Sequence, residues 1–203
     1  MDSAMGQILL PNQPDLGAVV SIEARDGREL RVRHMRMEDA ALLERMFYKL
    51  SSETRYRRFF GPVDSIDEDR LHHETQRLAT INPGRETALI LVIDEAGHEE
   101  AVAVARYACL DNREAACEGS IVIRDDFQRL GLGQQLLDLL IQVALAHGLR
   151  HMVLLTHADN SSMIALVQSL GVPYKGRYSA GLYEMDVQLV DAAVPYFPFT
   201  SPA

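Results

Sequence analysis

The sequence predicts a single α/β domain built on a mixed central sheet with helices on its faces. Alternating apolar and polar runs, typical of strands, occur on both sides of runs with helical spacing. Residues 118–157 follow the order strand, glycine turn, helix, strand, which requires a parallel crossover. The length of 203 residues suits one domain of ordinary size.

The first third of the chain predicts a hairpin followed by helices. Asp26-Gly27 lies between two alternating runs and favours a tight turn, because both central residues of such a turn need positive φ. Apolar residues at helical spacing, with acidic residues at the start, predict a helix within 36–50. Two more helices are expected at 51–61, capped by Ser51 or Ser52, and at 65–78, capped by Ser65.

The rest of the chain predicts strands interleaved with two helices. Strands are expected at 87–94, 101–110, 118–124, 151–157, 175–180 and 182–189. The connection between the first two is expected over residues 95–100. A long helix should follow the glycine turn and end at Gly148. A shorter one should begin after Asn160 or Ser161 and stop at Gly171.

The domain boundaries follow from composition. Residues 1–17 mix prolines and polar residues and are expected to form a flexible N-terminal arm. Residues 18–190 form the expected domain, without an internal linker. Residues 191–203 form a tail rich in proline and aromatic residues, which cannot extend a helix or a central strand.

Bulk properties exclude several classes of function. A net charge of -9 argues against nucleic-acid binding, because phosphate contacts need clustered cations. The chain has no apolar run of the roughly 18 residues that a membrane span needs, and no signal peptide is expected. The two cysteines suit a reducing cytoplasm. No metal site is expected, since His72 and His73 point apart on a helix and lack further ligands.

The stretch "QRLGLG", residues 128–133, joins a strand to a helix and predicts an anion-binding turn. Backbone N–H groups at a helix N-terminus attract phosphates, and glycines allow close approach. The stretch lacks the third glycine and the early position of a dinucleotide-binding fingerprint, and no lysine follows Gly133 as in a nucleotide-triphosphate loop. Spacing alone leaves a pyrophosphate site and a purely structural turn both open.

The wider segment "IVIRDDFQRLGLGQQLLDLLIQVALAHGLRHMVLLTHADNSSMIALVQSLG" resembles the core of the GNAT superfamily of acetyl-CoA-dependent N-acetyltransferases. The resemblance covers about residues 29–189. "LSSETRYRRFF" and "EGSIVIRDD" are similar to the GNAT domains of bacterial Pat-type protein lysine acetyltransferases. The resemblance implies a sheet with antiparallel N-terminal strands and a parallel, splayed pair in the middle.

The resemblance also implies a set of cofactor-binding residues for acetyl-CoA. The backbone of the turn would hold the coenzyme A pyrophosphate. The main chain of the preceding strand would run beside the pantetheine and polarise the thioester carbonyl. Asn160 would bond the pantetheine arm. The residues of the strand and turn are Ile121, Val122, Ile123, Gln128, Arg129, Leu130, Gly131, Leu132 and Gly133.

Glu118 is the expected catalytic residue. Acetyl transfer needs a neutral amine, and a lysine is almost wholly charged at pH 7, so a general base is required. Glu118 begins the strand that would hold the thioester and matches a catalytic glutamate of Pat-like relatives. The family's usual tyrosine, its general acid, is replaced by Val167. Water, the departing amine proton, Tyr174 or Tyr183 would have to protonate the thiolate.

The expected function is transfer of an acetyl group from acetyl-CoA to a primary amine, with a protein lysine preferred. An acyl-CoA synthetase is one conceivable protein acceptor. The alternatives are a small-amine acetyltransferase and a non-catalytic acyl-CoA-binding regulatory module. The basic cluster of Arg55, Arg57 and Arg58 fits recognition of an acidic surface or phosphate, or pairing with Glu53 on the helix surface. The protein is expected to be a cytoplasmic monomer or homodimer.

Overall fold

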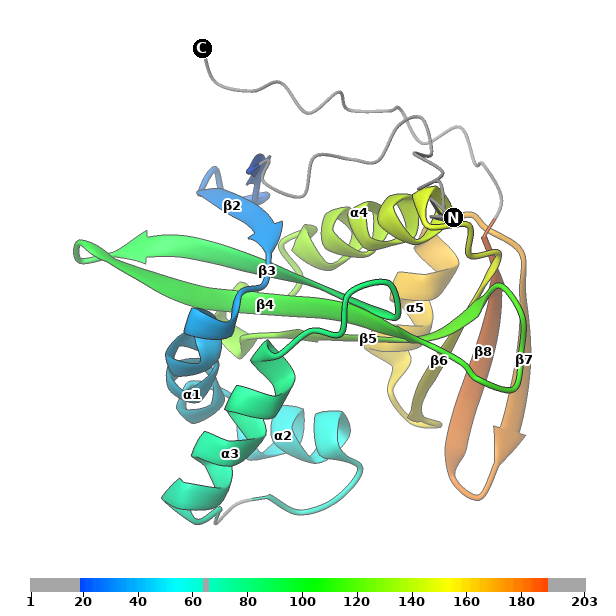
Figure 1. Cartoon of the computed structure of the whole chain (residues 1–203), viewed down its shortest axis with the longest axis horizontal. Helices are drawn as coiled ribbons and strands as arrows, with labels where there is room; N and C mark the ends of the chain where they lie inside the picture. The colour runs from blue at the N-terminus through cyan, green and yellow to red at the C-terminus, as the bar shows by residue number, and fades with distance from the viewer. Residues whose placement is uncertain (1–18, 64–65, 190–203) are drawn as a thin grey trace, which may run out of the picture.

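The computed structural model describes residues 19–63 and 66–189, which build an eight-stranded sheet with helices on both faces (Figure 1). The strands lie in the order β1-β2-β3-β4-β5-β6-β8-β7. All neighbours are antiparallel except β5 and β6. This confirms the predicted α/β class, with antiparallel strands first and a parallel pair in the middle. The strands are β1 Val20–Glu23, β2 Glu29–His34, β3 Glu86–Glu95, β4 His98–Cys109, β5 Ala116–Ile123, β6 His151–His157, β7 Tyr174–Ser179 and β8 Leu182–Gln188.

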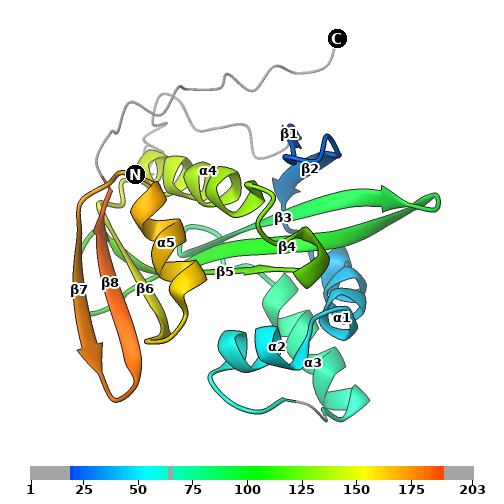
Figure 2. The same cartoon turned by 180° about the vertical axis from the view of Figure 1, so that it is seen from behind.

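Two groups of helices cover opposite faces of the sheet (Figures 1 and 2). One face carries α1, α2 and α3, and the other carries α4 and α5. Two short 3-10 helices, η1 and η2, precede α1 and α4. The elements are η1 Met37–Asp39, α1 Ala40–Tyr48, α2 Ser52–Phe59, α3 Glu68–Ala79, η2 Asp125–Phe127, α4 Leu132–Ala146 and α5 Ser161–Ser169.

Each face of the sheet has its own hydrophobic core, and β3 contributes to both. Leu89 and Leu91 join the core under α4, while Ile90 and Val92 join the core under α1 and α3. Alternate side chains of a strand point to opposite faces, so a strand covered on both sides must be apolar throughout. The apolar run of β3 therefore places it at the centre of the fold.

Local turn chemistry explains where the boundaries differ from expectation. The β3–β4 connection is a two-residue turn, Ala96-Gly97, with φ of 55° and 82°. Alanine rarely adopts positive φ, so the sequence suggested a longer loop. Helix α3 has Asp67 as its N-cap, and Ser65 lies outside the described residues. The expected arm and tail, 1–17 and 191–203, lie outside them as well.

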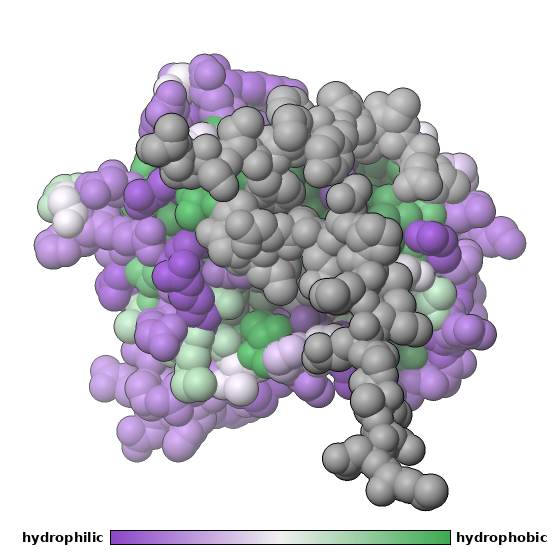
Figure 3. Space-filling model, turned by 45° about the horizontal axis from the view of Figure 1, so that its top comes forward, coloured by the Kyte–Doolittle hydropathy of each residue, from purple (hydrophilic) through white to green (hydrophobic). Residues whose placement is uncertain are grey.

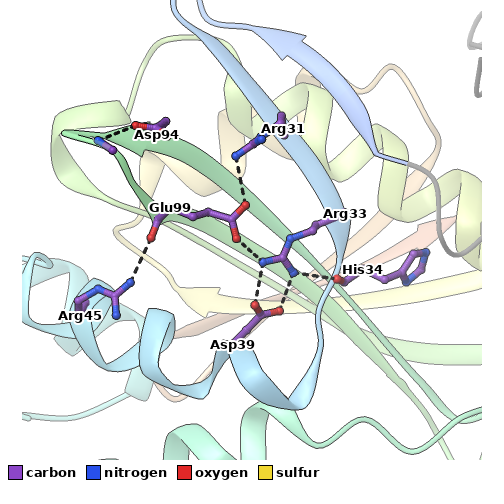
Figure 4. Close-up of polar contacts among 8 residues, drawn as sticks. Arg31, Arg33, His34, Asp39, Arg45, Asp94 and Glu99 are labelled. Carbon is purple, nitrogen blue, oxygen red and sulfur yellow. Dashed lines mark hydrogen bonds and ion pairs between the residues drawn. The ribbon is translucent and has the colours of Figure 1, made fainter. Parts of the chain in front are cut away.

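An ion-pair network ties β2 to η1 and to the β3–β4 hairpin (Figure 4). Both terminal nitrogens of Arg33 donate to the carboxylate of Asp39 at 2.7 Å, and Nη2 also donates to Glu99 at 2.6 Å. The side chains of Arg33 and Asp39 are only 10% and 6% exposed. Asp39 also accepts the backbone N–H of Arg36 and so caps η1. A bidentate, buried pair of this kind fixes the entry of the first helix.

The described surface is hydrophilic around much of its edge, with smaller hydrophobic patches between (Figure 3). Within residues 19–63 and 66–189, every helix is too short or too polar to cross a membrane.

Candidate active site

A cleft opens where the two parallel strands separate. Strand β6 pairs with β5 only as far as Gly119 and Leu154. Beyond that point β5 follows β4 to Ile123, while β6 follows β8 to His157. The resulting cleft has a volume of about 750 Å³ and is lined by β5, the turn after it, α2 and α5.

Gly119 sits where the strands part, and its missing side chain permits the close approach. A Cβ there would lie 2.6 Å from Sδ and 2.8 Å from Cγ of the fully buried Met152. Leu154 would be 2.9 Å away. A glycine inside a strand often marks such an approach. That pattern was present in the sequence, although Gly119 was not among the expected site residues.

The exposed edge of β5 offers backbone groups to the cleft. Arg124 donates its backbone N–H to Val102 of β4 at 2.9 Å. Because N–H directions alternate along a strand, the N–H groups of Ile121 and Ile123 point the other way, toward the cleft. The carbonyl of Ile123, which points the same way as its N–H, supports this direction. It accepts a hydrogen bond at 3.0 Å from the side chain of Gln128, which lies at the cleft.

The glycine turn presents a run of free backbone donors. Among the described residues, no protein acceptor pairs with the backbone N–H groups of residues 129–134. Two residues of the turn have left-handed backbone, Arg129 with φ 63° and Gly131 with φ 80°. The carbonyl of Leu130 accepts the N–H of Arg25 at 3.0 Å, which fixes the turn against the β1–β2 hairpin. Free donors at the start of a 15-residue helix form an anion cradle.

The side chain of Asn160 caps α5 at the opposite wall. Its Oδ1 accepts from the N–H of Met163 at 3.2 Å, and its Nδ2 donates to Thr156 Oγ1 at 2.9 Å. One amide hydrogen remains available to a ligand. Eight of the ten expected cofactor residues line the cleft: Ile121, Val122, Ile123, Gln128, Arg129, Gly131, Gly133 and Asn160. The side chains of Leu130 and Leu132 do not, and Leu132, the first residue of α4, is buried in the core.

Helix α2 lies beside the ends of β5 and β6 (Figure 2), and several of its residues line the cleft. Its first turn is held at the β5 end, where the N–H and hydroxyl of Ser51 donate to Asp125 at 2.8 and 2.7 Å. At the β6 end, Arg57 donates to Asn160 Oδ1 at 2.9 Å. Tyr56 also stacks there on His157, with ring centroids 4.9 Å apart. These long-range partners could not be read from the sequence of α2.

A second hollow of about 530 Å³ lies between α1, α3 and the sheet. Its walls are mainly apolar, from residues such as Met46, Leu71 and Val104. Val122 and Arg58 line both hollows. The cleft and the second hollow therefore meet at these two residues, and a group held along β5 could react with one held under α1 and α3.

Glu118 lies on the face of β5 that carries Val122, because side chains two residues apart share a face. Glu118 is exposed, and it lies one residue before Gly119, the last residue of β5 that pairs with β6. Its side chain lines neither hollow. Burial lowers the pKa of Arg58, the positive charge of Arg106 lowers it further, and the carboxylate of Glu118 raises it. Glu118 is therefore electrostatically coupled to the side chain at which the two hollows meet.

The other titratable candidates lie away from this meeting point. Tyr174 and Tyr183 line neither hollow, and Val167 is fully buried in the core. Cys117 is buried, and desolvation raises the pKa of its thiol to about 12, which suppresses the nucleophilic thiolate. Among the described residues, no group of three or more His, Cys, Asp or Glu side chains could hold a metal ion.

Comparison with known proteins finds a family model and a relative that match this chain. The acetyltransferase (GNAT) family matches residues 45–172. An acetyltransferase of Pseudomonas aeruginosa is 33% identical over 147 residues, covering 72% of this chain and 76% of that protein.

Solved structures share the fold. The GNAT domain of S. lividans PAT has a TM-score of 0.71 at 22% identity, covering 87% of this chain and 99% of that one. The yncA acetyltransferase of Salmonella typhimurium, solved with its cofactor acetyl-CoA, has a TM-score of 0.58 at 22% identity, covering 82% and 97%.

Proposed function

Since the chain belongs to the acetyltransferase (GNAT) family, we propose that it transfers an acetyl group from acetyl-CoA to a primary amine, with Glu118 as general base. The family binds acetyl-CoA or coenzyme A. The observation that carries the proposal is the meeting of the two hollows at Val122 and Arg58. A transferase needs both substrates at one point, whereas a binding module needs only the cleft.

The described residues fit acetyl-CoA. The free N–H groups of residues 129–134 suit a pyrophosphate. Ile121 and Ile123 direct N–H groups into the cleft, where one of them can donate to a thioester carbonyl and stabilise the negative charge that develops on its oxygen. The remaining amide hydrogen of Asn160 suits the pantetheine arm.

Acetyl-CoA supplies an activated thioester when it is bound, and the chain handles the protons. Glu118 accepts a proton from the ammonium form of the acceptor, which leaves a nucleophilic amine. The C–N bond forms as the C–S bond of the thioester breaks. The second nitrogen proton passes through water to the leaving thiolate. Because Glu118 is exposed, it can return its own proton to solvent.

A protein lysine is the acceptor that the resemblance to Pat-type enzymes supports. The likeness in fold to the GNAT domain of S. lividans PAT is consistent with it. A small amine is the second candidate. The size and apolar walls of the second hollow favour it, since about 300–1,000 Å³ is typical of small-molecule sites.

A free-thiol assay with acetyl-CoA tests the proposal. Thiol release that depends on an added amine or protein is expected, with a new acetyl group on the acceptor by mass spectrometry. Incubation of a lysate followed by mapping of acetylated lysines separates protein acceptors from small ones. Thermal stabilisation by acetyl-CoA without thiol release from any acceptor would favour the regulatory module instead.

A further inference from the structure

Among the described residues Arg58, which lies where the two hollows meet, is in no ion pair, although the negative charge of Glu118 acts on it from a distance. Its guanidinium makes no hydrogen bond among these residues either. Its neighbours on α2 are engaged: Arg57 pairs with Glu53 at 2.6 Å, and Arg55 donates to the backbone carbonyl of Phe47 at 3.2 Å. Helix-surface pairing therefore accounts for Arg57 but not for Arg58.

A second guanidinium lies close to Arg58 on the sheet. Arg106 of β4 also lines the second hollow, with a side chain only 15% exposed. It pairs with Glu86 at 3.2 Å. The two cations are close enough for Arg106 to lower the pKa of Arg58, and burial lowers the pKa of each. Two partly desolvated like charges are unfavourable unless an anion joins them.

The charged residues of this mainly apolar hollow are mostly cationic, although the protein carries a net charge of -9. Its lining has four arginines, Arg58, Arg70, Arg77 and Arg106, against one acid, Glu74. Glu74 is paired with Arg77 at 2.9 Å. Positive charge therefore remains on the wall beside Val122, next to the position proposed for the reacting amine.

We propose that Arg58, supported by Arg106, binds a carboxylate that the acceptor carries beside its amine. The inference rests on the proposed function, because it concerns the acceptor of that reaction. Guanidinium groups bind carboxylates bidentately, and few other groups of an amine substrate would satisfy a partly buried cation. The carboxylate can be that of a free amino acid with an apolar side chain in the hollow, or that of an acidic residue beside an acceptor lysine.

Matched acceptors test the charge directly. Leucine and methionine are compared with their decarboxylated amines, and blocked lysine peptides with glutamate beside the lysine are compared with the same peptides carrying glutamine. We expect kcat/KM to be about 10- to 100-fold higher for the acidic member of the preferred pair, since a charge-assisted contact is involved. The preferred pair identifies the source of the carboxylate.

Three variants assign this preference to Arg58. Arg58→Met should abolish the preference, so that the acidic and the neutral acceptor of a pair react with equal kcat/KM. Arg58→Lys should restore part of it. Arg177→Met, which removes an exposed arginine from β7, should leave it intact. Thermal midpoints of all variants check that each remains folded.

The contrary outcomes are distinct. Equal rates for acidic and neutral acceptors in the wild type would overturn the inference while leaving the proposed function standing. A rise in the KM for acetyl-CoA of Arg58→Met, with the acceptor preference unchanged, would place Arg58 in the cofactor site instead.

Failure to acetylate any acceptor would refute the proposed function. Ligand-observed NMR would then decide the inference. Binding of leucine, methionine or the glutamate-containing peptide to the wild type but not to Arg58→Met would support the inference. Equal binding to both proteins, or binding to neither, would overturn the inference.

Discussion

Replacing Gly131 with alanine tests whether the glycine turn holds the cofactor phosphates. Gly131 has φ 80°, a left-handed conformation that a side chain disfavours. An added Cβ would lie 3.3 Å from Nε of Arg25, the flexible end of a side chain that can move. The perturbation is therefore mainly one of backbone conformation.

The magnitude follows from that conformation. A non-glycine residue in the left-handed region costs about 1–2 kcal/mol. If alanine relaxes the turn, the N–H groups of residues 129–134 rotate away, and binding must restore them at that cost. The Kd for acetyl-CoA should rise by about 5- to 30-fold.

Gly148 provides the matched control. It also has φ 80°, it follows α4 far along the chain from the turn, and nothing lies within 4 Å of an added Cβ. Gly148→Ala should lose about 1–2 kcal/mol of unfolding free energy, because the same conformational strain applies there. Its Kd for acetyl-CoA should stay unchanged.

Calorimetric titration with acetyl-CoA and urea unfolding measure the two quantities for both variants. The reasoning fails if Gly131→Ala binds acetyl-CoA within twofold of the wild type. It also fails if both glycine variants lose affinity equally, since the turn would then have no special part in binding.

Two further predictions concern stability. Asp39→Ala leaves the buried Arg33 with Glu99 alone and uncaps η1, so urea unfolding should show a loss of about 2–4 kcal/mol. The exposed Asp111→Ala should show no measurable change, and equal losses would contradict the role of burial. Burial raises the pKa of Asp138 to about 6 from 3.8, so the folded state holds the proton more tightly and stability should fall as pH rises from about 4 to 6. Asp138→Asn should remove this decline and raise the free energy of unfolding at pH 7 by about 1–2 kcal/mol. A variant with the same pH profile as the wild type would show that Asp138 does not cause the decline.

Local sequence patterns predicted much of the fold because the physics involved is local. Asp26-Gly27 marked the first hairpin, in which β1 pairs with β2, although only Gly27 of the two has the positive φ that was expected of both. Asn160 or Ser161 was expected to cap α5, and Asn160 does. The tight turn between β3 and β4 could not be predicted, because the positive φ of Ala96 is imposed by the strands on either side and is not one that alanine prefers.

Features that depend on distant partners could not be predicted. The position of β8 between β6 and β7 depends on the packing of the whole sheet. The placement of α2 beside the cleft depends on Asp125 and Asn160, which lie about 70 and 100 residues away from their partners. The sequence placed Arg58 in a basic cluster with Arg57, but only the structure separates the paired cation from the unpaired one.

The most direct test of the central claim is the turnover of Glu118→Gln with a lysine-containing acceptor. Glu114→Gln, an exposed glutamate four residues earlier, provides the same change of charge as a control. The account predicts that kcat/KM of Glu118→Gln falls by about 10²- to 10⁴-fold at pH 7 while the Kd for acetyl-CoA stays within twofold. The lost activity should return by about tenfold per pH unit toward the lysine pKa of about 10.4. Turnover equal to that of Glu114→Gln would contradict the account and remove Glu118 from the mechanism.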